Sequence, residues 1–168
     1  MEGSQPAPLS ASARRVQDAL DALGLDTVIT EHAASARTSQ EAADLLGCRV
    51  GQIAKSLVFR GTRSGEAVLV VASGANRVDE AKLGALLGEP IGRAKPEFVR
   101  EVTGYAIGGI PPVGHARKIS TWVDEDLLAF DVVYAAGGTP NALFPIRPAD
   151  LLRVCGGRCA DLRSSPSA

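Results

Sequence analysis

The fold of this chain is decided by the stretch "IAKSLVFRGTRSGEAVLVVASG", residues 53–74. Two runs rich in β-branched and apolar residues, 53–61 and 66–74, flank the polar segment "TRSGE". Short apolar runs on either side of a turn that contains glycine predict a β-hairpin. Any sheet built on this stretch therefore contains an antiparallel pair of strands.

Helices and strands are expected to alternate on both sides of the hairpin. Apolar residues at helical spacing, capping residues and terminal glycines predict helices over 11–23, 37–47, 78–88, 95–104 and 147–157. Runs of β-branched and aromatic residues predict further strands over 26–32, 118–124, 129–137 and 142–147. The order shows neither strict βαβ regularity nor an internal repeat. It favours a single α/β (α+β) domain with a mixed sheet and packed helices.

Length and composition fit one globular domain, with 168 residues of which 45% are hydrophobic and 22% charged. We expect the domain to span 11–162 and the ends, 1–10 and 163–168, to be disordered, because both ends are small, polar and contain proline. The longest apolar run, 67–72, is far too short to cross a membrane. The N-terminus also lacks the basic and apolar segments of a secretory signal, so we expect a cytoplasmic protein.

Charge and cysteine content exclude several classes of protein. The net charge of −1 excludes a broad basic surface, so any contact with nucleic acid is expected to be local. Three cysteines make a poor disulfide framework. In "CGGRC", residues 155–159, the two cysteines are separated by one residue more than in a zinc-type pair, and no second pair exists, so we expect no metal site. A nucleophilic pair of Cys48 with His115 has no local support, yet the sequence leaves it open.

Lys55 is the most informative charged residue of the predicted hairpin. Strand alternation places Lys55 on the same face as Leu57 and Phe59, which is the apolar side of the sheet. The chain uses four lysines against fourteen arginines, and a compact ammonium suits a tight pocket better than a planar guanidinium does. The alternative is a lysine at the start of a strand that extends its amine to solvent.

Two glycine-rich segments could form the walls of a pocket. "YAIGGIPPVGHARK", residues 105–118, combines flexible glycines with stiff prolines and leaves backbone N–H groups bare, which suits close contact with a small ligand. "AAGGTPN", residues 135–141, follows a predicted strand and could do the same. Both segments can equally be plain rigid turns.

Taken together, these segments resemble the YbaK family, the prolyl-tRNA editing domains found free or inserted in prolyl-tRNA synthetase. The resemblance runs from about residue 12 to 157 and rests on five pieces in order: "IAKSLVFRG", "VLVVASGANRVDEAKL", "GGIPPVGH", "KISTWVDEDLLAFDVVYAAG" and "RPADLLRV". It implies a YbaK-like α/β fold with a mixed, strongly curved sheet. It also implies hydrolysis of an amino acid wrongly esterified to tRNA, without a metal, a cofactor or a covalent nucleophile.

The resemblance also assigns residues to the site. Lys55 matches the lysine that the family requires for function. Gly108 and Pro112 match the ends of the family's GxxxP loop, whose interior here is Gly109, Ile110 and Pro111, so this loop is expected to hold the aminoacylated 3′ adenosine. The remaining expected pocket residues match the ends of two strands: Ser73, Gly74 and Gly137.

The leading hypothesis is a freestanding enzyme that deacylates mischarged tRNA, with tRNA(Pro) carrying a small non-cognate amino acid as its substrate. Its expected partner is the aminoacylated 3′ end of tRNA; a synthetase partner stays open, and neither DNA nor a membrane is expected. In one alternative the same fold is a module that binds tRNA or a synthetase without catalysis. In another, Cys48 or Cys155 acts as a nucleophile. The sequence contains no evident general base, and the family's substrate-assisted chemistry fills that role with a ribose hydroxyl or the amino group of the substrate.

Overall fold

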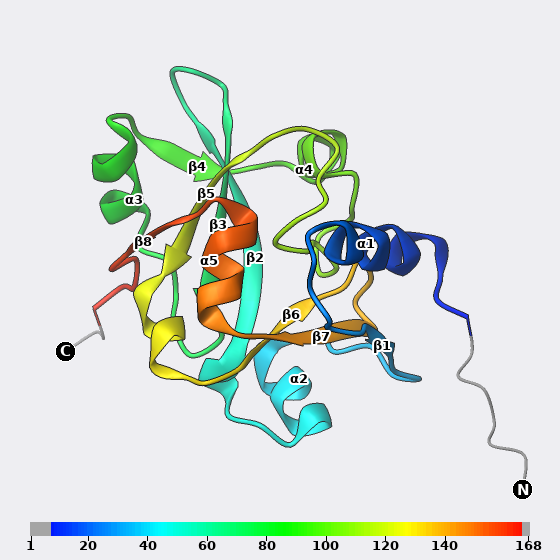
Figure 1. Cartoon of the computed structure of the whole chain (residues 1–168). Helices are drawn as coiled ribbons and strands as arrows, with labels where there is room; N and C mark the ends of the chain where they lie inside the picture. Colours follow the sequence, from blue (N-terminus) through cyan, green and yellow to red (C-terminus); the bar gives the residue numbers. More distant parts are fainter. Residues whose placement is uncertain (1–7, 166–168) are drawn as a thin grey trace, which may run out of the picture.

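The computed structural model describes residues 8–165, which form one mixed sheet with helices on both faces (Figure 1). The strands are β1 (Thr30–Glu31), β2 (Ile53–Gly61), β3 (Ala67–Ser73), β4 (Ile91–Arg93), β5 (Ser120–Asp124), β6 (Val133–Ala136), β7 (Ala142–Ile146) and β8 (Arg158–Ala160). The helices are α1 (Ala11–Ala22), α2 (Ser39–Leu46), α3 (Glu80–Leu87), α4 (Pro96–Thr103) and α5 (Pro148–Cys155), with 3₁₀ turns η1 (Val50–Gln52) and η2 (Glu125–Ala129). The predicted fold class is confirmed.

The predicted hairpin forms the centre of the sheet. β2 and β3 pair antiparallel from Ala54 opposite Ser73 to Arg60 opposite Ala67. The strand order is β1-β7-β6-β2-β3-β5-β8, and β4 also pairs with β2. Because β2–β6, β3–β5 and β5–β8 are parallel while the other pairs are antiparallel, the sheet is mixed, as the sequence predicted.

One edge of β2 is left partly open. β3 occupies one edge along almost its whole length, whereas the other edge pairs with β6 only at Ile53 and Ala54 and with β4 only from Phe59 to Gly61. Among the described residues, no strand pairs with this edge between Lys55 and Val58. This gap in the sheet exposes the part of β2 that carries Lys55.

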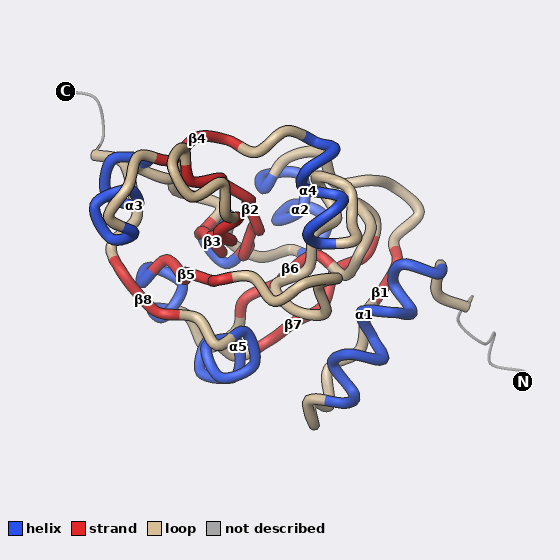
Figure 2. Tube along the Cα trace, turned by 90° about the horizontal axis from the view of Figure 1, so that it is seen from above, coloured by secondary structure: helices blue, strands red, loops and turns tan. Residues whose placement is uncertain are grey.

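The two faces of the sheet are covered by different helices. The larger apolar core packs side chains of α1, α4 and α5 against one face. A second core, around Leu83 of α3, Phe59 and Trp122, covers the other face. Figure 2 shows α1 beside β1 and β7 at one end of the molecule, with α3 and β8 at the opposite end.

Helix α1 also supports two loops of the candidate site. The Arg15 guanidinium donates to the Gly104 carbonyl and lies 4.8 Å from the centre of the Tyr105 ring. At Gly138, which has φ +104°, a Cβ atom would lie 2.7 Å from the Ser12 carbonyl oxygen. The segments 105–118 and 136–141 are therefore both packed against the N-terminal helix.

Some local expectations differ from the structure. The strand predicted over 26–32 is reduced to β1, which pairs with the first two residues of β7, and the short strands β4 and β8 were not foreseen. Arg163 and Ser164, placed by the sequence in a disordered tail, are ordered: Arg163 pairs with Val78, and the Ser164 amide donates to the Arg77 carbonyl. Residues 1–7 and 166–168 lie outside the described residues.

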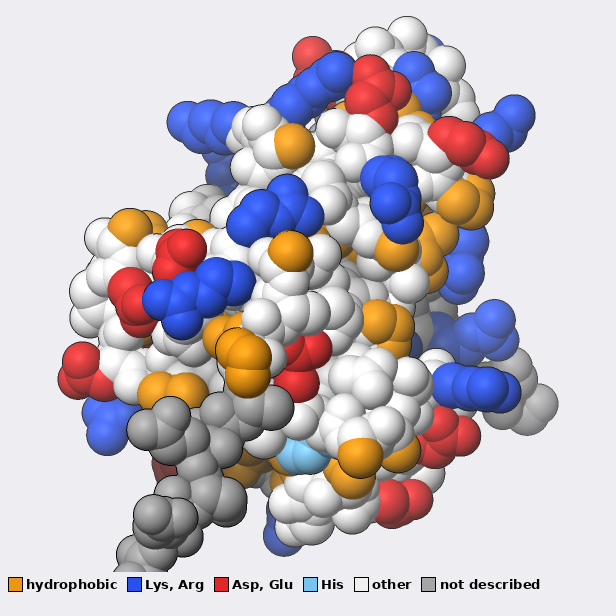
Figure 3. Space-filling view, turned by 90° about the vertical axis from the view of Figure 1, so that its right-hand side faces the viewer, with side chains coloured by type: hydrophobic (Ala, Val, Ile, Leu, Met, Phe, Trp, Pro, Cys, Tyr) orange, Lys and Arg blue, Asp and Glu red, His pale blue; other side chains and the backbone are white. Residues whose placement is uncertain are grey.

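The side of the molecule that carries α1 is mixed in charge. Figure 3 shows basic and acidic side chains interspersed there. Within residues 8–165, no helix is long and apolar enough to cross a bilayer.

Candidate active site

A small cavity of about 220 Å³ lies beside the open edge of β2. Its walls come from β2, from the segment before and within α2, and from the two glycine-rich loops. The lining residues are Ala36, Arg37, Thr38, Ser39, Ala42, Ile53, Ala54, Lys55, Ser56, Leu57, Ile107, Gly108, Ile110, Ala136, Thr139, Pro140, Ala142 and Leu143. The structure therefore brings together β2 and the two glycine-rich loops, which are far apart in the sequence and which the sequence analysis had singled out.

Lys55 lies at the boundary between this cavity and a larger cleft on the α3 side of the sheet. Its side chain is half-buried, and Nζ donates to the Asn76 carbonyl oxygen at 2.7 Å. Burial lowers the pKa of Lys55, the charges of Arg93 and Arg77 lower it further, and Asp124 opposes the shift. The ammonium is thus held in place beside the cavity rather than extended freely into solvent.

Asn76 is itself fixed by two carboxylates. Its side-chain amide donates to Asp124 at 2.9 Å and to Asp126 at 2.7 Å. Asp124 is 1% exposed and also accepts from the Ser73 amide. This network holds the carbonyl that binds Lys55, so it positions the ammonium from a distance.

The 105–118 loop divides its predicted residues between the cavity and the core. Gly108 and Ile110 line the cavity, while Pro111 and Pro112 are buried outside it. Gly109 is buried against the other loop, since a Cβ atom there would lie 2.7 Å from the Thr139 Cα. The glycine at this position therefore permits close packing of one loop on the other.

His115 forms a hydrogen bond with the backbone of Pro111. His115 Nε2 lies 2.7 Å from the Pro111 carbonyl oxygen, so the neutral Nε2–H form donates to it. Burial lowers the pKa of His115, and this hydrogen bond opposes the shift. His115 thus stiffens the loop and is absent from the residues that line the cavity.

Ser73, Gly74 and Gly137 are also absent from the cavity walls. Ser73 Oγ donates to the Gly51 carbonyl, and a Cβ atom at Gly74 would lie 2.5 Å from the Val50 carbonyl oxygen. At Gly137 a Cβ atom would lie 3.0 Å from Ile29 Cγ2. These three residues pack strand ends and turns next to the site.

Two lining residues outside the predicted set have hydroxyls that lack a partner among the described residues. Ser56 Oγ and Thr139 Oγ1 are buried without a hydrogen-bond partner in the described structure, where His32 Nε2 is the third such atom. A buried hydroxyl without a partner costs about 1–3 kcal/mol, and a ligand that supplies the partner removes that cost. Strand alternation alone would place Ser56 opposite Lys55, so only the gap in the sheet explains why both line one cavity.

The cavity offers neither a metal site nor a side-chain base. No aspartate, glutamate, histidine or cysteine is among its lining residues, and residues 8–165 contain no cluster of three such groups that could hold a metal. Cys48 packs in a small apolar cluster beside α2, and burial raises the pKa of the Cys48 and Cys155 thiols, which favours their unreactive form.

Comparison with known proteins identifies the family to which this fold belongs. Residues 33–154 match the family model described as the aminoacyl-tRNA editing domain, and the chain belongs to this family. It is 34% identical over 123 residues to the uncharacterized protein YwhH of Bacillus subtilis, covering 73% of this chain and 78% of that protein. It is 26% identical over 158 residues to the multifunctional Ser/Thr-tRNA deacylase ProXp-y of Escherichia coli K12, covering 92% and 94%.

Among solved structures, the chain is similar to the crystal structure of "a putative trans-editing enzyme for prolyl tRNA synthetase". The two share 51% sequence identity with a TM-score of 0.90, over 94% of this chain and 100% of that one. The family that the sequence resembled is therefore confirmed. The roles of single residues stay predictions.

Proposed function

We propose that this protein hydrolyses the ester between a small non-cognate amino acid and the 3′ end of tRNA, with tRNA(Pro) as the first candidate. The observation that carries the proposal is the position of Lys55: its ammonium is fixed at the edge of a small cavity that contains two hydroxyls without partners. The family supports the reaction class. The trans-editing neighbour supports the choice of tRNA(Pro).

In the proposed reaction, a water attacks the ester carbonyl carbon, and the carbonyl oxygen becomes an oxyanion. Lys55 stabilises the developing charge together with backbone N–H groups of the 105–118 loop. The C–O bond to the ribose then breaks, and the proton lost by the water ends on the ribose oxygen. Products are the free amino acid and a tRNA with an intact 3′ end.

The proton acceptor is proposed to come from the substrate. Because no carboxylate or imidazole lines the cavity, the amino group of the ester or the neighbouring ribose hydroxyl is left to orient the water. Ser56 and Thr139 line the same cavity, and their buried hydroxyls are the proposed hydrogen-bond partners of these polar groups once substrate is bound. This arrangement needs no metal and no covalent enzyme intermediate.

Selection of the amino acid is proposed to be steric. An annex of about 70 Å³ shares part of its lining with the cavity; its walls are mostly apolar and include Val58 and Val99, together with Arg93. Ser56, Leu57, Ile107 and Ile110 line both spaces. So small a space favours a short side chain over a bulky or ring-constrained one.

A cytoplasmic location follows from the proposal, because aminoacyl-tRNA is made and used there.

The decisive experiment measures single-turnover deacylation of tRNA(Pro) charged in turn with alanine, serine, threonine, cysteine and 2-aminobutyrate. Lys55→Ala is expected to lower the rate by about 10²-fold or more, by analogy with the loss of one preorganised donor. Lys55→Arg should also be slow, because a planar guanidinium directs its donors differently. Lys95→Ala, which removes an exposed lysine, is the matched control and should keep the wild-type rate.

Three results would overturn parts of this proposal. Near-normal turnover in Lys55→Ala removes the catalytic role of the lysine. Tight binding of tRNA by the wild type without any deacylation favours the binding module. Loss of activity on thiol alkylation favours a nucleophilic cysteine.

A further inference from the structure

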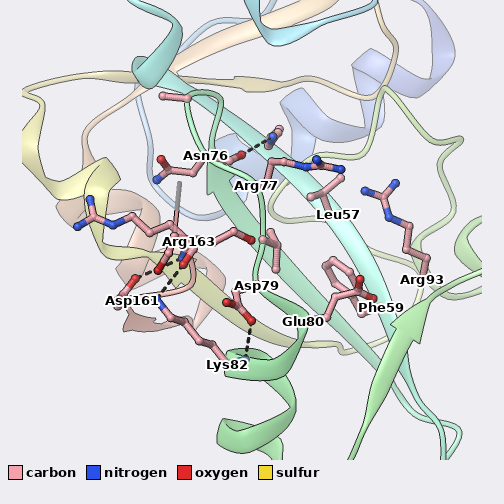
Figure 4. A pocket seen from close by; sticks show the side chains of 15 residues that line it. Leu57, Phe59, Asn76, Arg77, Asp79, Glu80, Lys82, Arg93, Asp161 and Arg163 are labelled. Atoms are coloured by element: carbon pink, nitrogen blue, oxygen red, sulfur yellow. Dashed lines mark hydrogen bonds and ion pairs between the residues drawn. The ribbon is translucent and has the colours of Figure 1, made fainter. Parts of the chain in front are cut away.

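A second, larger hollow of about 1020 Å³ lies on the α3 side of the sheet (Figure 4). We name it the basic cleft. Five cations line it: Lys55, Arg77, Lys82, Arg93 and Arg163. Figure 4 shows the guanidinium ends of Arg77 and Arg93 directed towards the same part of the cleft, next to Leu57.

Two of these cations are neutralised by the protein itself. Lys82 pairs with Asp161 at 3.0 Å, and Arg163 pairs with Asp126 at 3.1 Å. The ion pairs found within residues 8–165 do not include the other three, Lys55, Arg77 and Arg93. They form a group of like charges on one side of the cleft.

The group is close enough for its members to affect one another. The charges of Arg93 and Arg77 each lower the pKa of Lys55, so both arginines repel the Lys55 ammonium, and Asp124 offsets part of this repulsion. Three carboxylates, Asp79, Glu80 and Asp161, also line the cleft, so its five cations outnumber its acidic groups. Like charges that lie close together destabilise the free protein, and an anion bound among the three cations outside ion pairs reduces this repulsion. The cleft is therefore built for an anionic ligand.

Three features favour a polynucleotide backbone over other anions. Lys55 lines both hollows, so a chain whose ester lies in the cavity passes directly into the cleft. Guanidinium groups match the geometry of phosphate oxygens. Phe59 is the aromatic residue of the lining and is 2% exposed, so the cleft offers no ring on which a base could stack.

We propose that the basic cleft binds the phosphates of the single-stranded 3′ end of tRNA, with Arg77 and Arg93 as the contact residues. The inference rests on the proposed function and deepens it, since it states how the end of the tRNA reaches Lys55. Contacts to phosphate fix the position of a strand without reading its bases. The cleft thus positions the terminal nucleotides, and the identity of the tRNA is read elsewhere.

The test compares two substrates that carry the same ester. One is alanyl-tRNA(Pro), and the other is 3′-O-alanyl-adenosine, which contains no phosphate. Arg77→Ala/Arg93→Ala should lower kcat/KM for the tRNA substrate by tenfold or more and leave the adenosine substrate within twofold. Each phosphate contact to a single strand contributes about 0.7 to the log–log dependence of affinity on salt, so the double variant should flatten this slope by about 1.4.

The matched control is Arg14→Ala/Arg153→Ala, which removes the same charge from exposed positions on α1 and α5. It should keep the wild-type slope and kcat/KM. An equal loss on both substrates would overturn the phosphate contact, because the arginines would then act on the ester or on folding. An unchanged salt slope would overturn it as well.

Failure of the proposed function gives a different result. A wild type that hydrolyses neither substrate refutes the deacylase. Binding of a 5′-phosphorylated CCA trinucleotide, followed by fluorescence anisotropy, still reports on the cleft in that case. Loss of this binding in the arginine variant supports the cleft, and equal binding by both proteins refutes it.

Discussion

Replacement of Gly109 by alanine is a sensitive test of how the cavity is built. The added Cβ atom would lie 2.7 Å from the Thr139 Cα, 2.8 Å from its N and 2.9 Å from its C. Carbon atoms in contact lie about 3.5 Å apart or more, so the two loops must separate by at least about 0.8 Å. The neighbouring atoms are backbone, so a side-chain rotation cannot relieve the clash.

The expected effects concern both rate and stability. Displacement of the cavity wall by about 1 Å can reduce turnover by about 10²-fold. Overpacking costs about 1–3 kcal/mol, which for a chain of this size lowers Tm by about 2–12 °C. The contact with Thr139 adds a measurable loss of stability.

Single-turnover deacylation and thermal unfolding of the same preparation measure the two effects. Gly92→Ala is the matched control, because a Cβ atom there has no neighbour within 4 Å and the glycine has no positive φ. It should keep both the rate and Tm. If Gly109→Ala keeps the wild-type rate and Tm, the loops do not pack as described, and the cavity cannot depend on their contact.

Three further predictions address the hydroxyls, the histidine and the absence of a metal. Ser56→Ala and Thr139→Val should each lower kcat/KM by about five- to tenfold. Tm should be unchanged or raised, because each substitution removes a hydroxyl that lacks a partner in the free protein. A marked fall in Tm would show that the hydroxyl has a structural partner. His115 has a folded-state pKa below its ordinary value of 6.5, so the unfolded chain binds the proton more readily, and stability is lost as pH falls below about 6.5. His115→Gln should therefore lose less Tm than the wild type between pH 7.5 and 5.5, and equal losses would contradict this. Deacylation should persist in EDTA, because residues 8–165 contain no cluster of side chains that could hold a metal; a complete loss that zinc restores would contradict this prediction.

Local signals were sufficient for most of the fold. Capping residues and terminal glycines predicted the helices closely: Thr38 accepts from the Glu41 amide at the start of α2, and Gly47 ends the helix in the left-handed conformation. The hairpin followed from two apolar runs and a polar turn. In contrast, β4 and β8 have only three residues each, and they exist because longer strands offer them an edge. Such pairing depends on distant residues and leaves no local pattern.

The candidate site was predictable to a lesser extent. Lys55, Gly108 and Ile110 line the cavity as the resemblance implied. Their roles in catalysis and binding await the experiments above. Ser73 and Gly137 were expected in the pocket, but they contact neighbouring turns and core residues instead. A motif identifies important residues, but it does not separate those that touch a ligand from those that hold the backbone.

Ser56 and the basic cleft could not be found from sequence, and Thr139 was included only as part of the 135–141 segment. Strand alternation assigns each residue of β2 to one face, and it contains no information about a missing neighbour strand. Arg77 and Arg93 lie on different elements, so their convergence appears only once the chain is folded.

Because α1 packs behind the two loops, this domain can be moved between proteins intact only if α1 moves with it. The family model begins at residue 33, whereas α1 spans Ala11–Ala22 and supports Gly104, Tyr105 and Gly138 from outside that region. A segment cut at the limits of the model would retain Lys55 and its strand but lose the support behind the cavity walls. Transplantation into a larger enzyme would then require the host to supply an equivalent helix. The transferable unit is longer than the matched region, and its N-terminal boundary lies before Ser10, whose hydroxyl caps α1.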